Sequence, residues 1–129
     1  MLKTLFLIVT SLFTLNVLSQ GKLEITHLTG DFYIYTTYVD YEGIPFPSNS
    51  MYAVTPDGVV MFDTPWDTLQ VVPLLDSIKA RHGKDVVMCI ATHFHDDRTA
   101  GFDILKRLGV MTYSTRQTYD LCKETNRPL

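Results

Sequence analysis

The feature that most constrains the fold is an apolar run that ends in two histidines and a carboxylate. Residues 85–91 are predicted to form a strand buried on both faces of a sheet, because the segment is continuously apolar after its first residue. His93, His95 and Asp97 follow at every second position. Side chains with this spacing share one face of an extended segment, so we expect the three to converge. Since neutral imidazole and carboxylate are ligands that zinc prefers, the motif predicts a metal site.

The same residues also have a plain structural interpretation. Two histidines on one strand occur by chance, and Asp96 or Asp97 can cap the helix predicted after them. The location favours metal binding, because ligand sites gather at the carboxyl ends of strands and a buried strand holds its last side chains firmly. A two-metal site needs roughly twice as many ligands as this motif supplies.

Composition limits the class of protein. The 129 residues are 46% hydrophobic and 19% charged, which suits one small globular domain or part of a larger one. The formal net charge is −3 and the basic residues are scattered, so we expect no nucleic-acid partner. Cys89 and Cys122 leave a single disulfide open, but we expect a buried free thiol at Cys89 and helix packing at Cys122.

Residues 1–19 are predicted to be a secretory signal peptide, followed by a domain over residues 20–129. Lys3 precedes a mostly apolar segment, residues 5–18, that is too short to span a membrane, and small residues suit cleavage before Gln20. This predicts export to the periplasm without a stable membrane anchor. The alternative is a buried N-terminal helix.

The first half of the domain is predicted to be a meander of strands. Residues 23–28 alternate apolar and polar side chains, and residues 32–39 are rich in aromatic and β-branched types. Residues 49–55 and 59–62 are predicted to pair as a hairpin across a Pro-Asp-Gly turn. Asp63 follows the second of these strands, where it either binds loop amides or belongs to a site.

Residues 40–48 interrupt this meander, and their glycine and two prolines argue against a regular strand. Tyr41, Ile44 and Phe46 lie in this segment. They either fold back onto the core or form a flap whose apolar face meets a ligand.

Helices and strands alternate in the second half. A helix is predicted over residues 67–82, opened by the capping pair Asp67 and Gln70 and ended by Gly83, with a solvated His82. Pro73 either lies in the first turn or kinks this helix. A helix over residues 99–108, a strand over 110–113 and a helix from Ser114 to about Thr125 are predicted next. The order predicts an α+β fold, a mixed sheet with helices packed on one side.

Several of these motifs together resemble the class B metallo-β-lactamases, most strongly the dizinc enzymes of flavobacterial type. The resemblance runs from about residue 23 to residue 129 and is carried by the strand 33–38, the loop 43–49, residues 112–115, Asp63-Thr64-Pro65-Trp66 and His93-Phe94-His95-Asp96-Asp97-Arg98. Other hydrolases of that fold, such as glyoxalase II and zinc-dependent ribonucleases, mostly place a histidine where Arg98 stands. Arg98 therefore favours the lactamase subclass.

The resemblance implies the N-terminal half of an αββα sandwich that hydrolyses the β-lactam ring with two zinc ions. His93 and His95 would hold one zinc and Asp97 the second, with Asp97 also catalytic because it orients the attacking water. Asp63 and Arg98 would support these ligands from behind. The residues implied to contact the substrate are those of the flap and the floor of the site: Tyr41, Ile44, Phe46 and Trp66.

The family's other ligands, two histidines and a cysteine, belong to a C-terminal half that the 129 residues do not include. Neither Cys89 nor Cys122 matches that cysteine. We therefore expect this chain alone to be inactive, and the intact protein to be a monomer that acts on penicillins, cephalosporins and carbapenems. The alternatives are a hydrolase of the same fold with an ester or thioester substrate, and a partial domain without catalysis.

Overall fold

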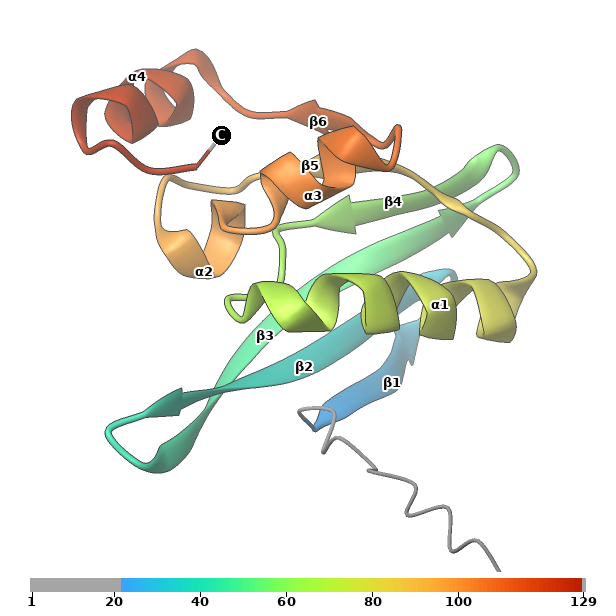
Figure 1. Cartoon of the computed structure of the whole chain (residues 1–129). Coiled ribbons are helices and arrows are strands. Elements are labelled where there is room, and N and C mark those ends of the chain that lie inside the picture. Colours follow the sequence, from blue (N-terminus) through green and yellow to red (C-terminus); the bar gives the residue numbers. More distant parts are fainter. Residues whose placement is uncertain (1–21, 129) are drawn as a thin grey trace, which may run out of the picture.

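A computed structural model describes residues 22–128, so the predicted signal peptide and its cleavage site lie outside the described residues. The described strands form one mixed sheet in the order β1-β2-β3-β4-β5-β6 (Figure 1). The strands are β1 (Leu23–Thr29), β2 (Phe32–Tyr41), β3 (Ile44–Thr55), β4 (Gly58–Phe62), β5 (Val86–Ile90) and β6 (Met111–Tyr113). The helices are the 3-10 turn η1 (Thr68–Gln70) and α1 (Val71–His82), α2 (Asp96–Thr99), α3 (Phe102–Arg107) and α4 (Arg116–Glu124).

Sheet pairing follows the predicted meander and then changes direction. β1 to β4 pair antiparallel, whereas β5 and β6 join parallel to their neighbours after helical crossovers. The predicted Pro-Asp-Gly hairpin is confirmed, with Thr55 paired to Gly58. The parallel pairing brings the carboxyl ends of β4 and β5 to the same edge of the sheet, which is where the polar motifs lie.

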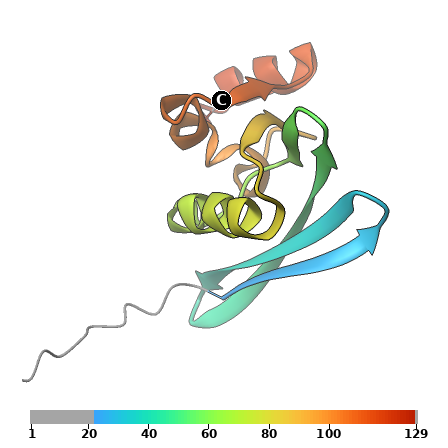
Figure 2. The same ribbon diagram turned by 90° about the vertical axis from the view of Figure 1, so that its right-hand side faces the viewer.

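The core lies on the sheet face that α1 covers. Figure 2 shows α1 against this face, and the opposite face is uncovered in the described part of the chain. The largest fully buried side chains belong to strands and helices on the covered side: Tyr35, Tyr52, Phe102, Met61, Leu74, Ile78 and Leu105. On the opposite face a register row of Ile34, Met51, Phe62 and Ile90 is only partly buried. The prediction that β5 is buried on both faces is therefore wrong for the described residues.

The flap segment is a β-hairpin, so the prediction of no regular strand over residues 40–48 is wrong. β2 extends to Tyr41 and β3 begins at Ile44, with Pro45 and Pro47 paired to Asp40 and Tyr38. A spacing of two puts both proline nitrogens on the same edge of β3. β4 pairs only with Met51 and later residues of β3, so no ladder hydrogen bond needs those nitrogens.

Two predicted helix boundaries also shift. The helix predicted over residues 99–108 is divided into α2 and α3 by a junction at Gly101, where an added Cβ would lie 2.8 Å from Val71 and 3.0 Å from Thr64. Close packing of this junction against α1 and the loop after β4 thus favours glycine over a good helix former. α4 is capped by the Thr115 hydroxyl, which accepts from the Thr118 amide, one residue later than predicted.

The helix predicted over residues 67–82 ends where the sequence indicates, but α1 begins only at Val71, because residues 68–70 form the 3-10 turn η1 and Gln70 makes no capping bond. The Asp67 side chain accepts from the Leu69 amide at the start of η1, and Gly83 ends α1 in the left-handed conformation at φ 66°. Pro73 lies in the first turn of α1, where its missing N–H costs no intrahelical hydrogen bond.

His82 at the end of α1 is packed against the sheet, so the prediction of a solvated histidine is wrong. Its Nε2 lies 2.9 Å from the Tyr52 hydroxyl, and its ring meets that of Tyr33 at 4.7 Å. Tyr33 and Tyr52 stack on each other at 5.1 Å. Burial, and then the charge of Arg81, lower the pKa of His82, while burial raises the pKa of Tyr52 to about 12. The pair is therefore held in its neutral forms.

This packing predicts a loss of stability in acid. Because the folded pKa of His82 lies below its unfolded value of about 6.5, the stabilisation is complete above that pH and is lost as the pH falls from it towards the folded pKa. We expect a lower urea midpoint at about pH 5.5 than at about pH 7.5, and a smaller difference in His82→Gln. Arg107→Gln, an exposed change elsewhere, serves as the control. An equal pH difference in His82→Gln would reject this role.

Candidate metal centre

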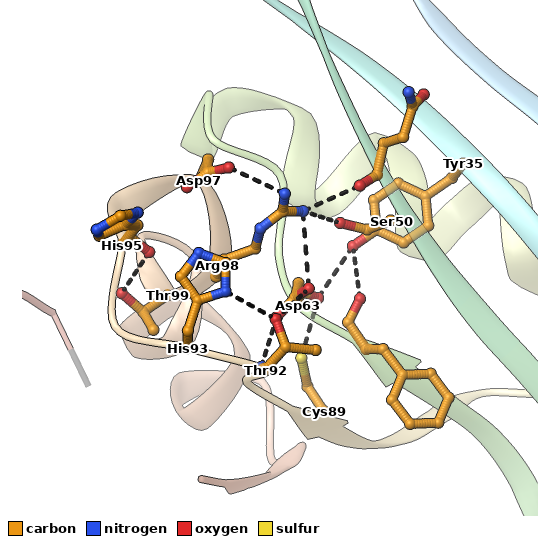
Figure 3. Close-up of polar contacts among 12 residues, drawn as sticks. Tyr35, Ser50, Asp63, Cys89, Thr92, His93, His95, Asp97, Arg98 and Thr99 are labelled. Carbon is orange, nitrogen blue, oxygen red and sulfur yellow. Dashed lines mark hydrogen bonds and ion pairs between the residues drawn. The ribbon is translucent and has the colours of Figure 1, made fainter. Parts of the chain in front are cut away.

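The structure brings His93, His95 and Asp97 together. One ligand atom of each lies within 4.8 Å of the others, and the two imidazole centroids are 4.9 Å apart (Figure 3). The geometry differs from the expected extended segment, because residues 92–95 form a bend and Asp97 lies in the first turn of α2. The three side chains converge because the chain turns from β5 into a helix.

The donor set suits a divalent cation. It combines two neutral-type nitrogen donors with one carboxylate, and His93 and Asp97 are partly buried while His95 is exposed. The alternative that Asp96 or Asp97 caps α2 is not what the structure shows, since the N-cap residue is His95 and no side chain makes a capping hydrogen bond there. The carboxylate of Asp97 therefore remains available as a ligand.

Asp63 anchors the start of the metal motif. It lies at the end of β4, is 5% exposed, and accepts hydrogen bonds from the Thr92 amide at 2.7 Å and from the Thr92 hydroxyl at 2.9 Å. Burial raises the pKa of its carboxyl, and the two Thr92 bonds act in the opposite direction. Its backbone is left-handed at φ 65°, a costly conformation for a residue other than glycine. Asp63 thus binds a loop amide and also belongs to the site, so both of the roles that the sequence offered for it apply.

Thr92 is the residue of the site that sequence reasoning missed. Its hydroxyl lies 2.9 Å from both carboxylate oxygens of Asp63 and 3.1 Å from Nδ1 of His93. The single hydroxyl proton is directed to the carboxylate, so we assign the remaining bond as donated by Nδ1–H of His93. That tautomer leaves Nε2 of His93 with the lone pair a metal needs. The only signal for Thr92 in the sequence was its position directly before His93.

Arg98 connects the motif to β3. Its Nη2 lies 3.2 Å from the Asp97 carboxylate, and Nη1 donates to the Asn49 carbonyl at 2.9 Å and to the Ser50 hydroxyl at 3.0 Å. Asp63 is 3.7 Å from the same Nη1, at the long limit of an ion pair. The buried Nε of Arg98 has no hydrogen-bond partner among the described residues. Arg98 therefore orients the Asp97 carboxylate from the side of the sheet.

The cysteines contribute no ligand to this group of three. Both are buried and free, so no disulfide joins them. The Cys89 thiol donates to the Asp63 carbonyl at 3.1 Å, and burial raises its pKa far above the ordinary value. Burial also raises the pKa of Cys122, which packs within α4 as expected.

The flap side chains project outward instead of folding onto the core. Tyr41, Ile44 and Phe46 are 56%, 66% and 51% exposed. The Phe46 ring meets the edge of Trp66 at 6.4 Å, so the loop after β4 supports the flap. Beside the metal group, a cavity of about 430 Å³ is lined by His93, Arg98 and apolar residues of the uncovered sheet face.

Comparison with known proteins places these features in one family. The family described as the metallo-beta-lactamase superfamily matches residues 43–119. The chain is 41% identical to the metallo-beta-lactamase type 2 of Elizabethkingia meningoseptica, covering 88% of this chain and 47% of the relative. It is 39% identical to metallo-beta-lactamase IND-1 of Chryseobacterium indologenes, covering 78% of this chain and 42% of the relative.

Solved structures agree with this match. The crystal structure of metallo-beta-lactamase IND-7 superimposes with a TM-score of 0.75 at 38% identity, covering 86% of this chain and 50% of that one. The metallo-beta-lactamase from Pontibacter korlensis gives 0.76 at 32% identity, covering 82% and 49%. The chain spans about half the length of the curated relatives it matches.

The Thr92 contacts predict a role in metal affinity. Thr92→Val removes the hydroxyl but keeps the amide bond to Asp63, so we expect affinity for a divalent cation to fall about 10-fold. Thr92→Ser keeps the hydroxyl and should bind as the parent does. Titration with Co²⁺, followed by its visible absorption, measures both variants. Equal affinities for Thr92→Val and the parent would show that the hydroxyl does not act on His93.

Proposed function

The chain belongs to the metallo-beta-lactamase superfamily, and on that premise we propose that it is the N-terminal part of a zinc enzyme that hydrolyses the β-lactam ring of antibiotics. The convergence of His93, His95 and Asp97 carries the proposal. The identity to two named metallo-beta-lactamases supports it, and conferred resistance would be the biological result.

Zinc is the metal we propose, because two imidazoles and a carboxylate match its preferred donors. Bound zinc supplies Lewis-acid activation of water and of a carbonyl oxygen at neutral pH. His93 and His95 would hold the first ion, with the hydrogen bond from His93 to Thr92 fixing one ring. Asp97, directed by Arg98, would bind the second ion and orient the attacking water. The remaining ligands are proposed to come from the length of the relatives that this chain does not span.

Substrate binding is assigned to the apolar surface beside the metal group. Ile44 and Phe46 of the flap are exposed, and Trp66 lies behind Phe46. An exposed apolar hairpin next to a polar site suits a ligand with a reactive amide and apolar substituents. The proposed substrates are therefore penicillins, cephalosporins and carbapenems.

For cellular location we propose export to the periplasm through residues 1–19, and a monomer as the working form. The leader composition supports export. Among residues 22–128, no helix has the length and apolar character needed to cross a bilayer.

The proposal predicts β-lactam hydrolysis by the intact protein with zinc. Absorbance assays with one penicillin, one cephalosporin and one carbapenem test it, with a chelator-treated sample as the control. Residues 22–128 alone should show little or no turnover, because a two-metal site needs roughly twice the three ligands they contribute. Zinc-dependent cleavage of a thioester or ester with no cleavage of any β-lactam would instead indicate a different hydrolase of the same fold.

A second prediction concerns His95 as a ligand. His95→Ala in the intact protein should lower zinc occupancy, because one of three converging donors is lost. Metal content after dialysis, measured by elemental analysis, reports this directly. His27→Ala is the matched control, since His27 lies in β1 and its Nε2 lies 2.9 Å from the Gly30 carbonyl oxygen. Unchanged zinc content in His95→Ala would remove His95 from the ligand set.

A further inference from the structure

Gln70 carries a buried amide that the metal chemistry does not use. It is 2% exposed, although it lies at the junction of η1 and α1, where a helix-start side chain usually faces water. The side chain makes no capping bond to α1. It is directed instead at the backbone of β2, 32 residues earlier in the chain.

The contact has the form of strand pairing. Nε2 of Gln70 donates to the Tyr38 carbonyl at 2.5 Å, and Oε1 accepts from the Tyr38 amide at 3.4 Å. The side-chain amide therefore pairs with both the backbone N–H and the backbone carbonyl of Tyr38, as a residue of a neighbouring strand would. Asp67 accepts the second Nε2 proton at 3.2 Å and holds the amide in this orientation.

Tyr38 needs such a partner because β1 ends before it. Its amide and carbonyl point away from β3, since the nitrogen of Pro47, the residue opposite in β3, faces away from β2. β1 pairs with β2 only as far as Thr37, opposite Leu23. Tyr38 is thus the point where β2 leaves the sheet core and continues into the flap hairpin, which turns after Tyr41.

We propose that Gln70 is a positioning residue that sets the direction of the flap hairpin relative to the metal group. The segment that carries Gln70 also carries Trp66, whose ring meets Phe46, one residue pair above Tyr38 and Pro47. One segment after β4 therefore holds the hairpin at its base and along its face. Gln70 acts on substrate binding through the flap and touches no reacting atom, and this role rests on the proposed function of the flap.

Hydrogen exchange in the intact protein tests the pairing of Gln70 with Tyr38, which we call the clamp, without any substrate. Gln70→Met keeps the length of the side chain but cannot pair with Tyr38. We expect the amides of Tyr38, residues 39–44 and Phe46 to exchange at least about tenfold faster, with the amides of β4 and β5 unchanged. Gln117→Met, the same change at an exposed site on α4, is the control. Unchanged exchange at Tyr38, or a rise that β4 and β5 share equally, would overturn the proposal.

Kinetics separate the clamp from the proposed activity. If the flap binds substrate equally in its ground and transition states, Gln70→Met should raise KM for a β-lactam about fivefold or more and change kcat less than about twofold. If Gln70→Met exchanges faster in an intact protein that cleaves no β-lactam, the result would support the role of Gln70 and reject the lactamase function. Normal KM with faster exchange would show that Gln70 holds the hairpin without setting substrate binding.

Discussion

The partly buried hydrogen bonds between Asp63 and Thr92 are the interaction on which the site depends. They join the loops that leave β4 and β5, which are parallel neighbours and so end at the same edge of the sheet. Burying a carboxylate is unfavourable, as the raised pKa of Asp63 indicates, and the amide and hydroxyl of Thr92 offset part of that cost. The loop that carries the metal motif therefore begins from a fixed point, and the orientation of His93 follows from it.

The segment from Asp63 to Gln70 extends this support in two further directions. Thr64 accepts from the Gly101 amide at 3.0 Å and donates to the Arg98 carbonyl at 3.1 Å, so it fixes α2 and the start of α3. At its other end, Gln70 pairs with β2 below the flap. Eight consecutive residues thus connect the ligand loop, the helix behind it and the flap, which explains why the polar side chains of Asp63, Thr64 and Gln70 are buried.

Short patterns in the sequence correctly predicted the features that depend on contacts between neighbouring residues. The Pro-Asp-Gly hairpin, the Asp67 and Gly83 caps and the order of strands and helices are all found in the structure. The errors lie where tertiary contacts overrule the pattern. Two prolines sit in a strand because β4 does not reach that edge, and a predicted helix breaks where Gly101 packs against Thr64. Gln70 looked like a capping residue because its pairing with Tyr38, far away in sequence, cannot be seen in a short motif.

The metal motif shows the same limit inside the site. Spacing of two predicted that His93, His95 and Asp97 meet, and they do, but Asp97 reaches the group from the first turn of α2. This difference matters because helical geometry places Arg98 directly beside Asp97, facing β3. Arg98 then bonds the Asp97 carboxylate and the Asn49 carbonyl, so a ligand and the strand that carries the flap share one guanidinium. An extended motif would have left the ligand carboxylate independent of the flap, whereas the turn into α2 couples their positions.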